Sequence, residues 1–369
     1  MSANHLAVGV DERETLVVGA GQAGLAIGYE LRERGLPFQI VDAESEIGAV
    51  WRHRWDSLRL FTAAQYDSLP GMDFPAAADT YPGKDDVADF LQAYAAKFEL
   101  PVKLNTRVAS LRVSNGGYLA ETDDGALAAK NVVVATGPFQ TPYVPPIAEG
   151  LSSETTQMHS TEYRNPETID KGPVLVVGGG NTGFQIAQEL AANHKVHLSI
   201  GSRQTPLPQR LLGRDLFWYL EATGLIRKSI ETRIGRKLSR RETLIGSSPR
   251  TLRRRYGVEV HGRAINASGS KLTFDDGSVL EPGAVIWATG FRSDYSWIDA
   301  PVFGVSSEVL HQRGVTQSPG LYFLGLSWQY TRGSALLGWV KDDAEYIAEQ
   351  VGISRPAAQA EARRPELVR

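Results

Sequence analysis

A glycine-rich turn that joins a short apolar strand to a helix occurs twice in the chain. The first copy is Gly19-Ala20-Gly21-Gln22-Ala23-Gly24, and the second is Gly178-Gly179-Gly180-Asn181-Thr182-Gly183. In such a G-x-G-x-x-G turn the first glycine makes the bend, the second lets backbone approach a pyrophosphate, and the third lets helix and strand pack closely. The helix N-terminus adds free N–H groups. Because each copy follows an apolar strand, residues 15–18 or 174–177, we predict two dinucleotide sites.

The residue that follows the next strand differs between the two units and predicts which nucleotide each one binds. In the first unit Asp42 follows residues 38–41, at the spacing of a carboxylate that accepts hydrogen bonds from ribose hydroxyls. In the second unit Ser202 and Arg203 stand at the matching place. A guanidinium attracts a ribose 2′-phosphate, which a carboxylate repels. The first site therefore suits the ADP part of FAD and the second suits NADPH, although Arg203 also fits an ordinary solvated surface arginine.

The chain of 369 residues contains no cysteine, which removes several classes of chemistry. Disulfides, thiol nucleophiles, iron–sulfur clusters and cysteine zinc sites are excluded, and we predict no metal site. The net charge of −3 gives no reason to expect nucleic acid or an anionic membrane as partner. No apolar run is long enough to span a bilayer, and residues 1–14 lack an apolar signal core, so we expect a cytoplasmic protein. The sequence is also compatible with a homodimer.

The remaining pattern predicts the strands and helices of an α/β fold. We expect helices at residues 22–34, 85–98, 182–192 and 334–351, and buried strands at 131–135, 196–200, 285–288 and 321–324. Residues 102–121 indicate a hairpin that turns at 115–117. Residues 47–75 are interpreted as an ordered loop region, 141–146 as an extended linker, and the tail from 354 as disordered. A strongly basic stretch at 227–255 is interpreted mainly as a solvated face.

Several motifs resemble those of class B flavin-dependent monooxygenases, especially the compact bacterial flavin-containing monooxygenases, and of CzcO-type FAD/NAD(P)-binding oxidoreductases. The segment Ile47-Gly48-Ala49-Val50-Trp51-Arg52 resembles the Gly-Gly-x-Trp segment beside the flavin, and residues 53–62 continue that loop. The elements Ala135-Thr136-Gly137 and Ala288-Thr289-Gly290 resemble the family's chain crossings between two domains. Residues 319–325 resemble the last strand under the flavin. The resemblance spans residues 15–351.

The chain departs from the family pattern just before the second glycine turn. The family pattern is Phe-x-Gly-x-x-x-His-x-x-x-Phe/Tyr; His159 and Tyr163 match it, but Ser153 and Thr155 replace the phenylalanine and the glycine. Baeyer–Villiger members typically carry Trp-Pro after the histidine, where this chain has Tyr163-Arg164. The resemblance therefore favours oxygenation of a soft nitrogen or sulfur over insertion into a ketone. His159 itself fits either a cofactor contact or a hydrogen-bonded structural histidine.

The resemblance implies two Rossmann-like dinucleotide-binding domains in a glutathione-reductase-like architecture. The FAD-binding domain is split in sequence, at residues 1–148 and 286–353, and the NAD(P)H-binding domain, 149–285, is inserted into it. The expected FAD contacts are Gly19, Gly21, Gln22, Ala23, Gly24, Asp42, Ala43, Val50, Trp51, His53, Trp55, Leu60, Phe61, Val108, Ala135, Thr136, Gly137 and Gly325. The expected NADPH contacts are Gly178, Gly180, Asn181, Thr182, Gly183, Ser202, Arg203, Thr289 and Gly290. Trp51 and Trp55 fit core aromatics equally well.

For function, the resemblance implies NADPH-dependent oxygenation of a small organic substrate by O₂, through a C4a-hydroperoxyflavin. No residue is assigned a catalytic role, because the cofactor carries the difficult chemistry. The N-terminus of the last helix, near Gly333-Ser334, is expected to stabilise reduced flavin. Two alternatives stay open: a flavin reductase or oxidase that passes electrons to O₂ or to an acidic redox partner docked on the basic stretch, and a cofactor-bound sensor. Disulfide reductase chemistry needs a cysteine pair, which is absent.

Overall fold

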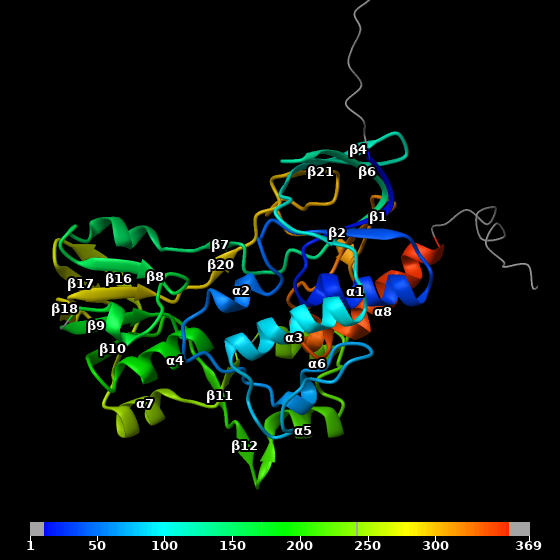
Figure 1. The fold of residues 1–369 in the computed structure, drawn as a ribbon. Coiled ribbons are helices and arrows are strands. Elements are labelled where there is room, and N and C mark those ends of the chain that lie inside the picture. The colour runs from blue at the N-terminus through cyan, green and yellow to red at the C-terminus, as the bar shows by residue number, and fades with distance from the viewer. Residues whose placement is uncertain (1–10, 171, 241–242, 354–369) are drawn as a thin grey trace, which may run out of the picture.

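The computed structural model describes residues 11–170, 172–240 and 243–353, which build two main β-sheets with helices packed on them (Figure 1). The larger sheet has ten strands, drawn from the beginning and the end of the chain. The smaller sheet has five strands, all from the middle of the chain. Figure 1 shows the sheets in two lobes, and the short strands β7 (Thr141–Pro142) and β20 (Phe291–Arg292) lie between the lobes as an antiparallel pair.

The ten-stranded sheet has a parallel centre in the order β3-β2-β1-β6-β24. Its central strands are continuously apolar because both faces are covered. Helices α1, α3 and α8 pack on one face, and the β4–β5 hairpin with residues 295–303 covers the other. The strands are β1 (Asp11–Val18), β2 (Phe38–Val41), β3 (Val102–Lys103), β4 (Val108–Ser114), β5 (Gly117–Thr122), β6 (Gly125–Val134), β21 (Ile298–Asp299), β22 (His311–Gln312), β23 (Val315–Thr316) and β24 (Leu321–Phe323).

The five-stranded sheet is parallel throughout, in the order β15-β10-β9-β19-β8. Helices α4 and α7 cover one face, and the small meander β16-β17-β18 covers the other. The strands of the five-stranded sheet are β8 (Thr156–His159), β9 (Pro173–Val177), β10 (Lys195–Ser199), β15 (Glu259–His261) and β19 (Ala284–Trp287). Those of the meander are β16 (Ala264–Ser268), β17 (Lys271–Phe274) and β18 (Val279–Leu280). The predicted domain boundary at 285/286 falls inside β19, which belongs to this sheet; the division into domains otherwise stays a prediction.

We call the part built on the ten-stranded sheet the first unit and the part built on the five-stranded sheet the middle unit. One segment of the middle unit packs against the first unit. We name residues 205–240 the bridging segment; it leaves the five-stranded sheet after β10 and contains β11 (Thr205–Leu207), β12 (Arg210–Leu211), β13 (Arg214–Asp215), α5 (Leu216–Ala222) and α6 (Arg233–Ser239). Phe217 and Ile226 pack there against Trp339 of the first unit. Arg227 of the bridging segment forms an ion pair with Asp342 of α8 (Val340–Ile353), and Figure 1 draws α5 and α6 in the lobe that contains α8. The bridging segment therefore holds the two units together.

Three of the four expected helices lie close to their expected positions, and the fourth is an exception; the other helices of the structure were not predicted. The helices are α1 (Gln22–Glu33), α2 (Ala49–Arg52), α3 (Lys84–Lys97), α4 (Asn181–Leu190), α7 (Pro249–Tyr256) and α8 (Val340–Ile353), with 3₁₀ turns at Ala64–Tyr66, Pro146–Gly150, Pro166–Thr168 and Arg332–Ala335. Strand β14 (Thr243–Ile245) pairs with β11. The hairpin turns as predicted, with Asn115 and Gly116 both at positive φ. Strands β1 and β6 start earlier than predicted, at Asp11 and Gly125, because β1 pairs with β6 from Asp11 onward and the start of β6 pairs with β5.

The exception is the last helix, which was expected from residue 334 and begins only at Val340. The preceding residues form the short 3₁₀ turn Arg332–Ala335, capped by Thr331, and Leu336 is extended. Gly338 then passes so close to the Tyr66 carbonyl that an added Cβ would lie 1.6 Å from its oxygen. The prediction that a helix N-terminus lies at Gly333-Ser334 is therefore wrong. The disordered tail predicted from residue 354 lies outside the described residues.

Candidate functional site

The first glycine turn is built from backbone contacts that leave no room for side chains at two of its three glycines. Gly19 has a φ of +110°, and a Cβ there would lie 2.6 Å from the Ala135 oxygen. A Cβ on Gly24 would lie 1.8 Å from the Gly19 oxygen. Around Gly21, by contrast, no described residue comes within 4 Å of an added Cβ. The turn is thus tight against the protein and open outward at Gly21, which fits the approach of a pyrophosphate to the start of α1.

The second glycine turn repeats these contacts. Gly178 has a φ of +142°, and a Cβ there would lie 2.0 Å from the Ala288 oxygen. A Cβ on Gly183 would lie 2.2 Å from the Gly178 oxygen. The Gly178 N–H donates to Ser199 O at 3.0 Å, as the Gly19 N–H donates to Val41 O at 2.8 Å. The two turns are therefore the same construction, and both cradles have the shape of a dinucleotide site.

The residues after the second strand of each unit are held very differently. Asp42 is half-buried, and its carboxylate accepts hydrogen bonds from the Ala20 N–H at 2.5 Å and the Glu44 N–H at 2.8 Å. It is thereby fixed beside the first glycine turn. Ser202 and Arg203 are exposed on a turn after β10, and the Gln204 amide donates to Ser202 Oγ at 3.0 Å. The Gln204 side chain lies over the second glycine turn, with Nε2 2.6 Å from a Cβ added at Gly179.

The two Ala-Thr-Gly elements lie where the chain passes between the units. Ala135 follows β6 and its N–H donates to Val18 O; Ala288 follows β19 and its N–H donates to Val177 O, both at 2.8 Å. Next to them, Thr289 Oγ1 donates to the Tyr143 carbonyl, and the Tyr143 N–H donates to Gly290 O at 2.9 Å. The crossings are thus tied directly to the first residues of both predicted sites.

His159 supports the second crossing. It is 3% exposed, its Nδ1 accepts from the Thr161 N–H at 3.2 Å, and its Nε2 therefore donates to Gly290 O at 3.1 Å. Burial lowers the pKa of His159. A buried, neutral imidazole with both nitrogens occupied is a structural histidine, which was one of the two alternatives for this residue.

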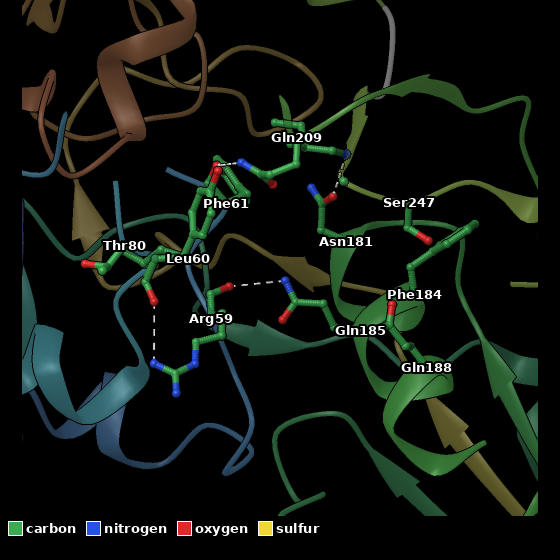
Figure 2. A pocket seen from close by; sticks show the side chains of 13 residues that line it. Arg59, Leu60, Phe61, Thr80, Asn181, Phe184, Gln185, Gln188, Gln209 and Ser247 are labelled. Atoms are coloured by element: carbon green, nitrogen blue, oxygen red, sulfur yellow. Dashed lines mark hydrogen bonds between the residues drawn. The ribbon is translucent and has the colours of Figure 1, made fainter. Parts of the chain in front are cut away.

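A cavity of about 470 Å³ lies between the predicted flavin-side loop and α4 (Figure 2). Leu60 and Phe61, predicted to contact FAD, and Asn181, predicted to contact NADPH, line this one space. Several of the other lining side chains are neutral and polar, but most of the surface that the lining residues expose to the cavity is apolar. The lining residues are Arg59, Leu60, Phe61, Thr80, Tyr81, Asn181, Phe184, Gln185, Gln188, Gln209, Ile245, Gly246 and Ser247.

The walls of this cavity are hydrogen-bonded across the two units. Gln185 Nε2 of α4 donates to Arg59 O at 3.2 Å, and Gln209 Nε2 of the bridging segment donates to Phe61 O at 2.6 Å, as Figure 2 shows. Asn181 Oδ1 accepts from the Ile245 N–H at 2.9 Å, so this side chain braces the wall. Hydrogen bonds from both units thus fix the shape of the cavity.

The other predicted FAD residues fall into two groups. Ala23 and Gly325 meet beside the first glycine turn, where a Cβ on Gly325 would lie 3.0 Å from the Ala23 Cβ. Gln22 is the first residue of α1, and Ala43 follows Asp42. Thr136 and Gly137 follow Ala135. The strand that begins at Val108 starts beside Asp42, because the Thr106 N–H donates to Asp42 O at 2.8 Å. These residues therefore lie around the first turn.

The second group is on the loop after β2, and it is less uniform. Val50 and His53 are exposed, and Trp51 is half-buried against both cores. Trp55 is 4% exposed and packs in the core of the middle unit with Phe184. Packing explains Trp55, and its contact with FAD stays a prediction. The remaining predicted NADPH residue, Thr182, lies in the first turn of α4 behind Gly180.

Sequence reasoning missed three charged residues near this region. The Arg54 guanidinium lies 5.4 Å from the ring centre of Phe139 and 5.3 Å from that of Phe291, and burial lowers its pKa. Burial also lowers the pKa of Arg332, in the 3₁₀ turn that replaces the expected helix start. Asp67 is fully buried, accepts from Thr62 Oγ1 at 2.6 Å, and has its pKa raised by burial to about 7. Arg54 lies in the loop that the resemblance covers, but nothing in the sequence marked its charge as buried; Asp67 and Arg332 lie in no motif.

The basic stretch at 227–255 is divided between exposed helices. Arg236 and Lys237 lie on α6, and Arg253, Arg254 and Arg255 lie on α7. Arg227 forms ion pairs with Glu221 and Asp342, at 2.6 and 3.3 Å. The described part of the stretch is solvated.

Comparison with known proteins identifies the family. Residues 16–210 match a family model described as pyridine nucleotide-disulphide oxidoreductase. A Geobacillus kaustophilus (strain HTA426) protein named uncharacterized oxidoreductase CzcO-like is 45% identical over 340 residues, which cover 92% of this chain and 98% of that relative. The chain belongs to the pyridine nucleotide-disulphide oxidoreductase family. It is a CzcO-type member without a cysteine, so disulphide chemistry of its own is excluded.

Other relatives of this CzcO-type oxidoreductase are flavin monooxygenases. The flavin-containing monooxygenase from Stenotrophomonas maltophilia has a TM-score of 0.79 at 29% identity, over 93% of this chain and 99% of that chain. Probable indole-3-pyruvate monooxygenase YUCCA9 of Arabidopsis thaliana is 28% identical over 91% of this chain and 88% of that protein. The resemblance to class B flavin-dependent monooxygenases is confirmed, and with it the α/β fold with two dinucleotide-binding domains. The chain is a flavoprotein oxidoreductase; no helix among its described residues is long and apolar enough to cross a membrane.

Proposed function

We propose that the chain is an NADPH-dependent FAD monooxygenase that transfers one oxygen atom from O₂ to the nitrogen or sulfur of a small organic substrate. The observation that carries this proposal is the shared cavity, because residues from the predicted FAD side and the N-terminal part of α4 line one space that is open to solvent on one side. A monooxygenase of this kind needs both cofactors and the substrate to meet in one site that excludes water.

The residues that would hold FAD are those of the first glycine turn and Asp42. Gly21 leaves the start of α1 open to a pyrophosphate, and Asp42 is held in place to accept from ribose hydroxyls. Bound FAD would accept hydride from the nicotinamide and activate O₂. The backbone around Gly325 follows the last strand of the sheet, next to Ala23 of the first turn, and would face the flavin side of the site.

The residues that would hold NADPH are those of the second glycine turn, with Arg203 as the proposed contact to the 2′-phosphate. Gly178 and Gly183 would let a pyrophosphate come close to the start of α4. Thr289 and Gly290 would orient the nicotinamide half, because the hydrogen bonds to Tyr143 and His159 fix them between the units. The proposed domain division, FAD at 1–148 with 286–353 and NAD(P)H at 149–285, separates the two glycine turns, whereas Thr289 and Gly290 of the NADPH set follow β19 in the FAD part.

The substrate class follows from the cavity lining and from the departures in the family pattern. Among the residues that line the cavity, Gln185, Gln188 and Gln209 carry neutral amides, and Arg59 carries a positive charge. Such a lining suits a small, uncharged or weakly polar amine or thioether. Tyr163, which stands where Baeyer–Villiger members carry tryptophan, is fully buried and donates to Glu189 at 2.9 Å, so it supports the middle unit.

The test supplies the FAD-loaded protein with NADPH, ¹⁸O₂ and a simple thioether such as methyl phenyl sulfide. We expect sulfoxide that carries one ¹⁸O atom, formed in step with NADPH consumption. A lag before oxidised flavin returns, after NADPH-reduced protein is mixed with O₂, is expected as well. Immediate reoxidation, with all reducing equivalents recovered as hydrogen peroxide or passed to a one-electron acceptor, would instead establish the flavin reductase or oxidase. The solvated basic helices α6 and α7 are the feature that favours this alternative.

A further inference from the structure

Three potential metal ligands lie on one face of the outer strand pair of the five-stranded sheet. His197 of β10 is in register with Glu259 of β15, and His261 follows two residues later on the same face. His197 Nδ1 lies 2.9 Å from His261 Nε2 and 3.5 Å from the nearer Glu259 oxygen. All three ligand atoms lie within 4.8 Å of one another. No sequence motif marks the cluster, because its histidines are 64 positions apart, and no metal was predicted.

The chemical types of the three side chains suit metal binding. Two imidazoles and one carboxylate are a common ligand set for divalent transition metals.

We propose that His197, His261 and Glu259 form a binding site for a divalent transition-metal ion such as Zn²⁺, Co²⁺ or Ni²⁺. With metal–nitrogen bonds of about 2.0–2.1 Å, two nitrogens 2.9 Å apart subtend an angle of about 90° at the ion. That angle suits six-coordinate Co²⁺ or Ni²⁺ directly, and a small outward rotation of His261 opens it for tetrahedral Zn²⁺. The Glu259 side chain is 51% exposed, so water can complete the coordination.

The two imidazoles are already held in position. His197 is 2% exposed, and the His261 ring stacks on Phe274 with 4.2 Å between centres and an 11° tilt. In the metal-free pair one proton lies between Nδ1 of His197 and Nε2 of His261. Metal binding moves that proton to the far nitrogen of the same ring, and both side chains stay neutral. Binding thus requires little reorganisation of the chain.

The position of the cluster gives a bound ion a structural consequence. Two residues further along the same strands, Ser199 Oγ donates to Gly262 O at 2.8 Å. The next residue, Arg263, donates to Gly201 O, at the start of the turn that carries Arg203. An ion at the cluster would join β10 to β15 immediately before the turn predicted to meet the 2′-phosphate of NADPH. The site is separate from the cofactor cavity and does not depend on the proposed reaction.

The affinity of the chain for Zn²⁺ tests the proposed metal site directly. The full-length, untagged, FAD-loaded chain is stripped with a chelator, and Zn²⁺ is titrated in competition with a chromophoric chelator. We expect one Zn²⁺ per chain. His261→Gln should weaken binding by about 100-fold or more, and Glu259→Gln by about tenfold. Lys195→Gln removes the 3.1 Å ion pair that competes for Glu259, and should tighten binding several-fold.

The matched control is His194→Gln, which removes a histidine of the same lobe that lies outside the cluster and should leave the affinity unchanged. At a free Zn²⁺ concentration about 100 times the wild-type dissociation constant, the folded-to-unfolded ratio should rise by about 100-fold in the wild type, and by only about tenfold in Glu259→Gln. If His261→Gln fails to fold, the half-exposed Glu259 and Lys195 still decide the matter. The absence of stoichiometric binding, or equal affinities in wild type, Glu259→Gln and His194→Gln, would overturn the proposal.

Discussion

Adding a methyl group at either of two glycines of the first turn should distinguish an effect on FAD binding from an effect on folding stability. At Gly24 an added Cβ lies 1.8 Å from the Gly19 oxygen, a backbone atom. Real Cβ contacts do not fall below 3.0 Å, so the strand and helix must part by at least about 1 Å. At Gly21 no described residue lies within 4 Å of the Cβ, and its φ of −74° and ψ of −173° suit any residue.

These contacts predict different magnitudes for the two variants. Overpacking of this kind destabilises by about 1–3 kcal/mol, which exceeds the gain of about 0.5–1 kcal/mol from replacing a helical glycine by alanine. Gly24→Ala should therefore lower the unfolding midpoint of the FAD-free protein by several degrees. Gly21→Ala loses at most about 1 kcal/mol as a poorer N-cap. Its methyl group occupies the approach of the pyrophosphate, so FAD affinity should fall at least about tenfold, or about 1.4 kcal/mol.

Thermal unfolding of the FAD-free protein and fluorescence titration with FAD measure the two effects separately. Gly21→Ala should unfold close to the wild-type midpoint and bind FAD poorly, whereas Gly24→Ala should be impaired in both. Wild-type FAD affinity in Gly21→Ala would refute the assignment of the pyrophosphate to this turn. A wild-type midpoint in Gly24→Ala would refute the packing argument.

Three other predictions concern charge and the bridging segment. Arg203→Ala should raise KM for NADPH by about tenfold or more and leave KM for NADH nearly unchanged, and equal changes would refute the contact with the 2′-phosphate. Because burial raises the pKa of Asp67 from 3.8 to about 7, the folded chain keeps a proton that the unfolded chain releases. The free energy of unfolding should therefore fall by up to about 4 kcal/mol as pH rises from about 4 to 7. Thermal unfolding across this range should show that Asp67→Asn removes this fall. Parallel pH profiles of stability in the wild type and in Asp67→Asn would contradict the prediction. The Asp215 carboxylate caps α5 by accepting from the Phe217 N–H at 2.7 Å, and it also accepts from the Tyr81 hydroxyl at 2.7 Å. Asp215→Ala should therefore reduce the stability of the bridging segment by about 1–3 kcal/mol and increase limited proteolysis within residues 205–240. An unchanged cleavage pattern would argue against this anchor.

The parts of the fold that the sequence predicted are those that local chemistry determines. The two glycine turns could be located because Gly19, Gly24, Gly178 and Gly183 each face a backbone oxygen that excludes any side chain. Helix α3 followed from its apolar spacing, which puts Val87, Phe90, Leu91 and Tyr94 on one buried face. These features depend on neighbours in sequence or on backbone alone.

The features that escaped prediction depend on distant contacts. The start of α8 at Val340 is set by the passage of Gly338 against Tyr66, some 270 positions earlier in the chain. The bridging segment carries no motif, and contacts with distant residues, such as Phe217 with Trp339 and Gln209 with Phe61, show that it packs on the first unit. Arg54 and Asp67 acquire their shifted pKa values from burial that no local pattern reveals. Tertiary packing thus decided the site's walls, while local sequence decided its turns.

The contrast between Asp42 and Arg203 bears on how each proposed cofactor would be held. Asp42 is fixed by two backbone N–H groups before any ligand arrives, so little conformational freedom is lost when ribose hydroxyls bind. Arg203 is exposed on a turn, and ordering such a side chain offsets about 0.5–1.5 kcal/mol of the interaction. A preorganised site favours slow release, and a site that must be ordered favours exchange. Gel filtration of the FAD- and NADPH-loaded protein should therefore retain FAD and remove NADPH, and loss of both at equal rates would show that the fixed carboxylate does not hold FAD.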